Sequence, residues 1–335
     1  MTARADKLLT IDTHHHMLPD FFWQETENAH APVGGLAPLR WSPDVTVSFM
    51  DNAGIDVAVV SLSTPGVHTG DSAKARTLAR RCNEFAATLV QAKPDRFASF
   101  ACLPLPAVDA SLEELAYAMD VLKLDGCVLF TNAHGVYLGD AVLEPIFDEL
   151  ERRDAVVFVH PNPSPDVAAH SLGLPDNVID FPTDTNRVVA QMHYTGRFAR
   201  TPSVKYIFSH AGGSIPYLAA RFAIIDEMGF IPGAEQRGTA ADMFRRMYWD
   251  TALAAGDPVL RMLRDVAGMT QVLFGTDFPY QRQDLAARSK HVVQRAALND
   301  GERIDMLGGN AARLFPRLRA VLDQGICGNA RIHQT

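Results

Sequence analysis

The chain has 335 residues, of which 47% are hydrophobic and 21% are charged, a balance typical of a globular protein and not of an extended, disordered one. Its formal net charge of -8 argues against nucleic acid or an anionic membrane as a partner, because both require concentrated lysine and arginine. Small molecules or other proteins are therefore the expected partners.

Short apolar runs rich in β-branched residues recur along the chain and predict strands that are buried on both faces. These runs occupy residues 8–14, 57–63, 97–104, 126–132, 156–161, 204–210, 247–253 and 271–277. Between them, apolar residues recur at helical spacing, as in segments 71–94, 109–123, 139–153, 183–198 and 256–268. Eight alternations of strand and helix predict a TIM-like (β/α)8 barrel, because an open doubly wound sheet usually has fewer strands.

A Gly- and Pro-rich insertion follows the first predicted strand. It includes the sequence NAHAPVGGLAPLRWSPD at residues 28–44, and long excursions at the catalytic end of a barrel often cover the active site. We expect residues 24–44 or so to form a lid or a pocket wall. The barrel itself is predicted to occupy residues 1–318 as one domain, followed by a C-terminal tail at 319–335.

Three consecutive histidines end the first predicted strand, in TIDTHHHMLPDFF at residues 10–22. Apolar residues flank them on both sides, unlike a purification tag. Side chains alternate along a strand, so His14 and His16 share one face and His15 points to the other. Two imidazoles on one face can bind a single metal ion at about 2.0–2.1 Å, although a hydrogen-bonded strand end would show the same pair.

Other polar residues also stand at predicted strand ends, with His160 at the fifth, His210 at the sixth and Asp277 at the eighth. Barrel active sites lie at the C-terminal ends of the strands, so these residues should meet at one mouth. The predicted metal ligands are His14, His16, His160 and Asp277. Such a set suits zinc first and manganese or iron next, and it leaves a position for water or substrate. His210 would remain beside the metal.

Five motifs in this order resemble the amidohydrolase superfamily. They are D-x-H-x-H at 12–16, VHP at 159–161, SHAGGSIPYLAARF at 209–222, GTDFP at 275–279 and GNAARLF at 309–315. More narrowly, the chain resembles the branch of aminocarboxymuconate-semialdehyde decarboxylase-like enzymes, which perform non-oxidative decarboxylation. The segments LSTPGVHTGD at 62–71 and LFTNAHGVYLGD at 129–140 look most like 6-methylsalicylate decarboxylases.

The resemblance implies the same four metal ligands, with His210 as a catalytic base or hydrogen-bond donor beside the metal-bound group. It also implies that Arg221 reaches into the pocket of a neighbouring subunit and holds a substrate carboxylate, which predicts a homodimer. The branch has a second carboxylate-binding arginine several residues before a tryptophan. Here Arg40 directly precedes Trp41, so that role is not transferred to Arg40. Trp41 and His134 are further candidates for substrate contact.

The sequence thus predicts a metal-dependent carboxy-lyase that releases CO2 from a small aromatic acid such as an ortho-hydroxybenzoate. Asp277 would donate a proton to the ring carbon, and His210 would orient or share that proton. The alternative is a hydrolase of a lactone or amide, or a hydratase, that acts on a small carboxylated substrate through metal-bound water. A non-catalytic barrel with structural zinc is disfavoured, because structural zinc usually has four closed ligands, many of them thiolates.

The sequence also predicts a cytoplasmic location. Its four cysteines lie far apart without a C-x-x-C spacing, and a chain of this size needs no disulfide bonds. No charged and then apolar leader begins the sequence, and no apolar run approaches the length of about 18 residues that a membrane span requires. We therefore expect reduced thiols and no membrane partner.

Overall fold

The computed structural model describes residues 9–26, 36–37, 39–229 and 231–320. Its centre is a sheet of eight parallel strands with the order β1-β2-β3-β4-β7-β8-β9-β10. The strands are β1 (Ile11–His16), β2 (Val57–Ser61), β3 (Phe97–Cys102), β4 (Gly126–Phe130), β7 (Val156–His160), β8 (Lys205–Phe208), β9 (Tyr248–Asp250) and β10 (Val272–Leu273). All eight predicted strands are present.

The segment after β10 returns to β1 and nearly closes the sheet into a barrel. The backbone N–H of Thr13 donates to the carbonyl of Phe274 at 2.9 Å, and His15 forms an isolated parallel bridge with Phe278. The strands are buried on both faces, since every residue of β1, β2 and β3 is buried. The predicted (β/α)8 barrel is confirmed.

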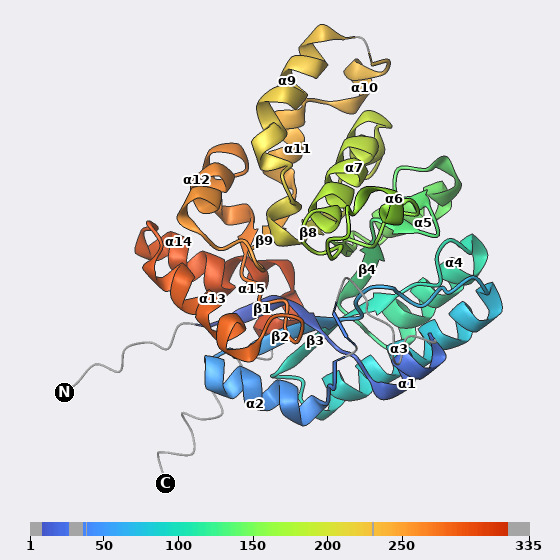
Figure 1. The fold of residues 1–335 in the computed structure, drawn as a ribbon, viewed down its shortest axis with the longest axis vertical. Coiled ribbons are helices and arrows are strands. Elements are labelled where there is room, and N and C mark those ends of the chain that lie inside the picture. Colours follow the sequence, from blue (N-terminus) through green and yellow to red (C-terminus); the bar gives the residue numbers. More distant parts are fainter. Residues whose placement is uncertain (1–8, 27–35, 38, 230, 321–335) are drawn as a thin grey trace.

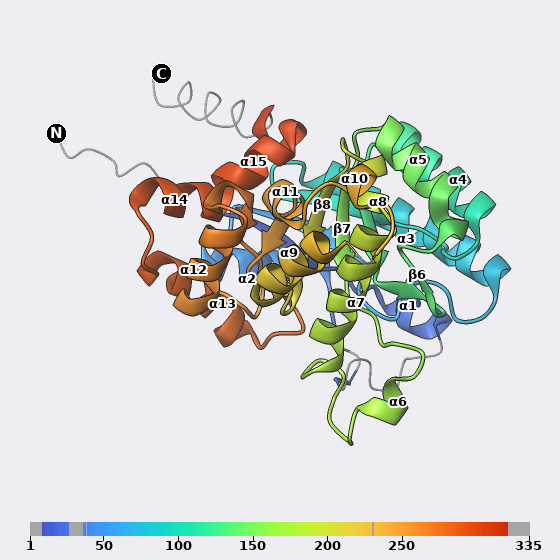
Figure 2. The same ribbon diagram turned by 90° about the horizontal axis from the view of Figure 1, so that it is seen from above.

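Helices surround the strands in Figure 1, and the view from above in Figure 2 shows α6 standing away from them. The helices are α1 (Asp20–Glu25), α2 (Pro43–Ala53), α3 (Ser72–Ala92), α4 (Val108–Ala116), α5 (Glu144–Arg152), α6 (Val167–His170), α7 (Asp180–Tyr194), α8 (Arg197–Arg200), α9 (Ala219–Met228), α10 (Ala234–Arg237), α11 (Ala240–Arg246), α12 (Asp257–Val266), α13 (Gln283–Arg295), α14 (Asp300–Ile304) and α15 (Asn310–Leu314). A short hairpin of β5 (Asn132–Ala133) and β6 (Val136–Tyr137) follows β4.

Helix α3 illustrates why the predicted helical segments fold as they do. The Asp71 side chain caps its first turn by accepting hydrogen bonds from the backbone N–H groups of Ala73 and Lys74. Leu78, Cys82 and Leu89 recur on one face and are buried. The apolar stripe packs on the barrel, as the helical spacing predicts.

Strand ends differ from the prediction where the chain turns toward the barrel mouth. Strand β8 ends at Phe208, before His210, and β10 ends at Leu273, four residues before Asp277. Both polar residues lie in tight turns with positive φ, at 54° for His210 and 59° for Asp277. These turns were predicted as strand because their apolar neighbours continue the pattern of the strands.

Parts of the predicted lid and tail lie outside the described residues, namely 27–35 and 38 in the lid and 321–335 in the tail. Cys82, Cys102 and Cys127 are free and buried, while Cys327 also falls outside this range.

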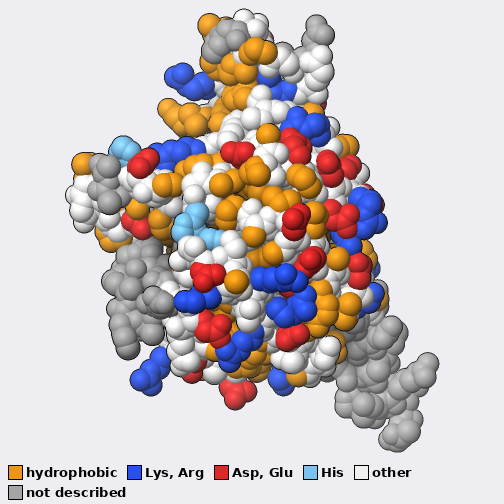
Figure 3. All heavy atoms as spheres, turned by 90° about the vertical axis from the view of Figure 1, so that its right-hand side faces the viewer, with side chains coloured by type: hydrophobic (Ala, Val, Ile, Leu, Met, Phe, Trp, Pro, Cys, Tyr) orange, Lys and Arg blue, Asp and Glu red, His pale blue; other side chains and the backbone are white. Residues whose placement is uncertain are grey.

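Within the described part of the chain, no helix combines the length and the apolar character needed to cross a bilayer. Acidic and basic side chains are interspersed on the face shown in Figure 3.

Candidate active site

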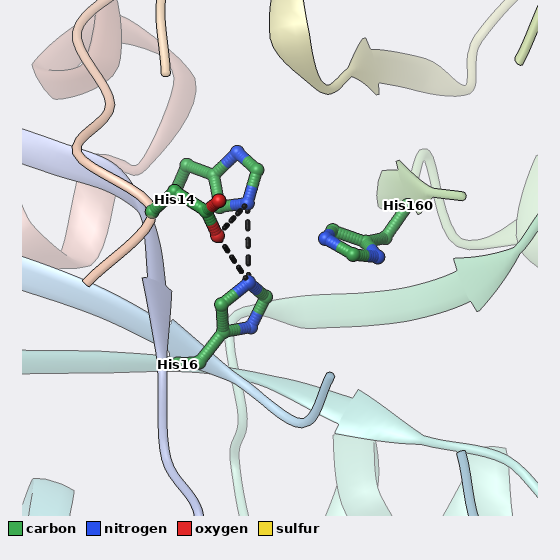
Figure 4. Close-up of side chains that lie close together, drawn as sticks. His14, His16 and His160 are labelled. Carbon is green, nitrogen blue, oxygen red and sulfur yellow. Dashed lines mark hydrogen bonds and ion pairs between the residues drawn. The ribbon is translucent and has the colours of Figure 1, made fainter. Parts of the chain in front are cut away.

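Strand β1 supplies the histidine pair in the alternation that the sequence predicts. His14 and His16 point toward one another from the same strand, with His160 projecting toward them from β7 (Figure 4), and the Nε2 atoms of His14 and His16 are 3.1 Å apart. His15 faces away, with its Nδ1 atom 2.9 Å from Asp12 Oδ2 and its ring against Phe278. The alternation therefore separates a paired face from a structural one.

Asp277 joins this pair from the turn after β10. Its Oδ1 atom lies 3.2 Å from His14 Nε2 and 3.1 Å from His16 Nε2. His160 stands at the end of β7 with its ring centroid 4.9 Å from that of His16. One ligand atom from each of these four residues lies within 4.8 Å of the others, and all four residues are buried. The structure thus brings the four predicted metal ligands together.

The hydrogen bonds made by the Nδ1 atoms of these imidazoles decide whether a cation fits between their Nε2 atoms. His14 Nδ1 lies 2.8 Å from Asp250 Oδ2, and His160 Nδ1 lies 2.9 Å from the carbonyl of Pro161. An imidazole that donates through Nδ1 exposes a lone pair at Nε2, so these acceptors turn lone pairs toward the centre. Facing lone pairs and a carboxylate oxygen at close range repel unless a proton or a cation lies between them. Three imidazoles and a carboxylate fit a divalent cation.

The pKa shifts of the cluster residues also favour a bound cation. Burial lowers the pKa of His14, but the carboxylates of Asp250 and Asp277 outweigh burial and raise that pKa to about 10. Burial lowers the pKa of His160 well below its usual value, and the neighbouring His16 and His14 lower it further. Burial raises the pKa of Asp277, but His14 and the hydrogen-bonding histidines bring it well below its usual value. Without a metal ion, the cluster thus favours a protonated His14 beside an ionised Asp277 and a neutral His160, and a divalent cation would take the place of the His14 proton.

His210 lies beside the cluster, with its ring centroid 4.7 Å from that of His14. Its Nδ1 atom is 3.1 Å from the carbonyl of Ala252, which leaves Nε2 available. The turn is tight, because a Cβ at Gly212 would come within 2.3 Å of the Trp249 ring, and only glycine fits there. Positive φ at a non-glycine residue costs free energy and tends to occur at functional sites.

Asp250 connects the metal cluster to His210. Its Oδ2 atom meets His14 Nδ1, while its Oδ1 atom accepts the backbone N–H groups of His210 at 3.0 Å and Ala252 at 2.9 Å. The structure shows Asp250 bonded to a predicted metal ligand, where a carboxylate fixes the tautomer of the imidazole.

A pocket of about 530 Å³ opens over the cluster and is lined by His160, His210 and Asp277. Tyr280 also lines it, with its ring centroid 5.4 Å from that of His16. Tyr280 is not among the residues predicted from the sequence, although its place three residues after Asp277 was a usable signal.

Three residues predicted to contact substrate lie elsewhere within this chain. Trp41 is buried with its ring centroid 6.0 Å from that of Phe85, and His134 lines a separate cavity of about 450 Å³ beside His68. Arg221 is exposed on α9. None of the three is among the described residues that line the metal pocket.

Comparisons with known proteins agree with this geometry. An amidohydrolase family model matches residues 11–317. The 6-methylsalicylic acid decarboxylase acuB of Aspergillus aculeatus is 35% identical over 330 residues, covering 95% of this chain and 99% of that protein. The 2-keto-4-carboxy-3-hexenedioate hydratase of a Sphingobium strain is 26% identical, covering 94% of this chain and 98% of that protein.

A solved structure is similar as well. The dihydroxybenzoic acid decarboxylase from Polaromonas, with bound manganese and the inhibitor 2-nitroresorcinol, has 25% sequence identity and a TM-score of 0.76, covering 92% of this chain and 97% of that one. These matches confirm the resemblance that the motifs indicate. The chain belongs to the amidohydrolase family, and the geometry of its histidine and aspartate cluster fits a divalent metal ion.

Proposed function

We propose that this chain is a metal-dependent, non-oxidative decarboxylase of a small aromatic acid of the ortho-hydroxybenzoate class. The observation that carries the proposal is the position of Asp277, which belongs to the metal cluster and also lines the pocket beside His210. A proton donor for the ring and a cation for the substrate oxygens are thus available at one place. The decarboxylases among the similar proteins support this choice.

His14, His16, His160 and Asp277 would hold the cation. When bound, it would fix the carboxylate and the ortho-hydroxyl oxygen of the substrate and stabilise phenolate charge. The ligand set alone favours zinc over manganese. The manganese named for the Polaromonas structure favours manganese instead, so both metals belong in the test.

Because His14 and the hydrogen-bonding histidines hold the pKa of Asp277 well below its usual value, the proton that Asp277 donates would arrive with the substrate. The phenolic hydroxyl of the substrate passes its proton to the Asp277 carboxylate. Asp277 then delivers that proton to the ring carbon that bears the carboxylate, and the bond from this carbon to the carboxyl carbon breaks to release CO2. The phenolate oxygen regains a proton from water. His210, held through its Nδ1 atom by Ala252, orients the reacting group through Nε2.

We further propose a homodimer in the cytoplasm, in which Arg221 serves the pocket of the partner subunit. Helix α9 presents Ile224 and Met228, which are 56% and 64% exposed, together with Tyr217 just before it at 73%. Large apolar side chains exposed this far often pack against another subunit. Within its own chain, Arg221 does not line the pocket, which fits a role across an interface.

A hydratase or a hydrolase is the second candidate, favoured by the similarity to a hydratase of a carboxylated substrate. The test is to incubate protein loaded with manganese or zinc with a panel of ortho-hydroxybenzoates, a pyrone dicarboxylate and an unsaturated keto acid. Release of CO2 with formation of the corresponding phenol supports the decarboxylase. Ring opening or addition of water without CO2 would overturn it.

A further inference from the structure

Arg282 places a cationic side chain at the rim of the metal pocket. Among the described residues that line this pocket, Arg282 is the one lysine or arginine, and Asp277 is the one carboxylate. The whole chain is acidic, with a formal net charge of -8. An anionic substrate therefore approaches a pocket with one negative side chain and one positive side chain in its wall.

The backbone holds Arg282 at this rim. Arg282 is the N-cap residue of α13, and its carbonyl accepts the backbone N–H groups of Leu285 at 2.9 Å and Ala286 at 2.8 Å. The turn between it and the metal cluster is also fixed, because the N–H of Gln281 donates to the carbonyl of Asp277 at 3.1 Å. Only the side chain of Arg282 is free to change its partner.

The present partner of that side chain is easily exchanged. Arg282 pairs with Asp284 through two hydrogen bonds, from Nε at 2.9 Å and from its terminal nitrogen at 2.8 Å. Both side chains are largely in solvent, at 74% and 50% exposure. Exposed ion pairs contribute little free energy, and a substrate carboxylate offers the guanidinium the same planar, two-point geometry.

We propose that Arg282 captures the substrate carboxylate at the pocket mouth, and that Asp284 is a competing internal anion which the substrate displaces. This inference rests on the proposed function, since it requires an anionic aromatic substrate. The metal would fix this carboxylate in the bound complex, and Arg282 stabilises the same bound anion from the pocket mouth without taking part in the bond-breaking step. It should therefore affect the Kd and the KM for anionic ligands while the kcat stays the same.

Two substitutions test the pair in opposite directions. Arg282→Gln removes the cation, so we expect salicylate to bind about threefold more weakly to metal-loaded protein, the size of one exposed ion pair. Asp284→Asn releases the guanidinium, so salicylate should bind about threefold more tightly. Salicylamide has nearly the same shape without the charge, and its Kd should be unchanged in both variants. The control is Arg295→Gln, an exposed cation about 20 Å away along α13.

Calorimetric titration of both ligands against the four proteins, together with the kcat and KM for an ortho-hydroxybenzoate, separates the outcomes. Loss of the Arg282→Gln effect at about 1 M salt, where screening is strong, adds support. If the wild-type protein binds salicylate and releases CO2, and Arg282→Gln does both equally well, the proposed role of Arg282 is overturned. The role of Arg282 is also overturned if Arg282→Gln binds salicylamide as much more weakly as it binds salicylate, or if Asp284→Asn binds salicylate more weakly than the wild-type protein does. Wild-type protein that neither binds salicylate nor releases CO2 overturns the proposed function itself.

Discussion

Replacement of Asp250 by asparagine should weaken metal binding without touching a metal ligand. The Oδ1 atom of Asp250 accepts two backbone N–H groups, so an asparagine oxygen would remain there. The amide NH2 would then face His14 Nδ1, where Asp250 Oδ2 now stands at 2.8 Å. Two donors cannot share this position, so His14 must accept at Nδ1 and carry its proton on Nε2. That is the atom predicted to bind the metal.

The size of the effect follows from two independent scales. Both side chains of this pair are completely buried, and a hydrogen bond to a charged group contributes about 1.5–3 kcal/mol. Loss of a carboxylate that orients a ligating histidine typically weakens metal affinity by about 10- to 100-fold, which is about 1.4–2.7 kcal/mol. The two ranges agree, so we expect Asp250→Asn to raise the metal Kd by 10-fold or more.

Competition with a chromophoric chelator, using zinc or manganese, measures this Kd, and circular dichroism checks that the variant is folded. Asp226→Asn is a matched control, because Asp226 pairs with His193 at 3.3 Å outside the metal cluster. It should leave the metal Kd unchanged. A folded Asp250→Asn variant whose metal Kd lies within about twofold of the wild-type value would refute the tautomer argument.

His160→Ala should lose both metal and activity, whereas His210→Ala should keep its metal and lose most activity; elemental analysis that finds the second variant metal-free would contradict our ligand assignment. Asp277→Asn keeps a residue that tolerates positive φ and should lower kcat by about 100-fold or more through loss of proton transfer, so near-normal turnover with bound metal would exclude the donor role. Chelation of a metal present at about 100 times its Kd should remove about 2.7 kcal/mol of stability and lower the Tm by about 4 °C for a chain of this length; an unchanged melting curve would argue against a bound metal. Co-expression of Arg221→Ala with His160→Ala should restore about a quarter of wild-type activity in a random mixture of dimers, and confirmed heterodimers without activity would rule out Arg221 acting across the interface.

The metal cluster could be predicted from the sequence because two simple rules place its members. Side-chain alternation along a strand is a local property, and it puts His14 and His16 on one face wherever the strand lies. In a barrel of parallel strands, residues at strand ends meet at the same mouth, which brings His160 and Asp277 to that pair. The number of strands and the helices between them could likewise be read from apolar periodicity.

Only the tertiary structure decided which other side chains reach the pocket. Trp41 and His134 follow the pattern of candidate contacts, yet packing directs the first against Phe85 and the second into another cavity. Tyr280 and Arg282 enter the pocket wall because the turn after β10 folds back over the cluster. The direction of a loop side chain depends on contacts with residues distant in sequence, and these have no periodic signal. The same holds for Asp250, whose partner His14 lies 236 residues away and was set by the closure of the barrel.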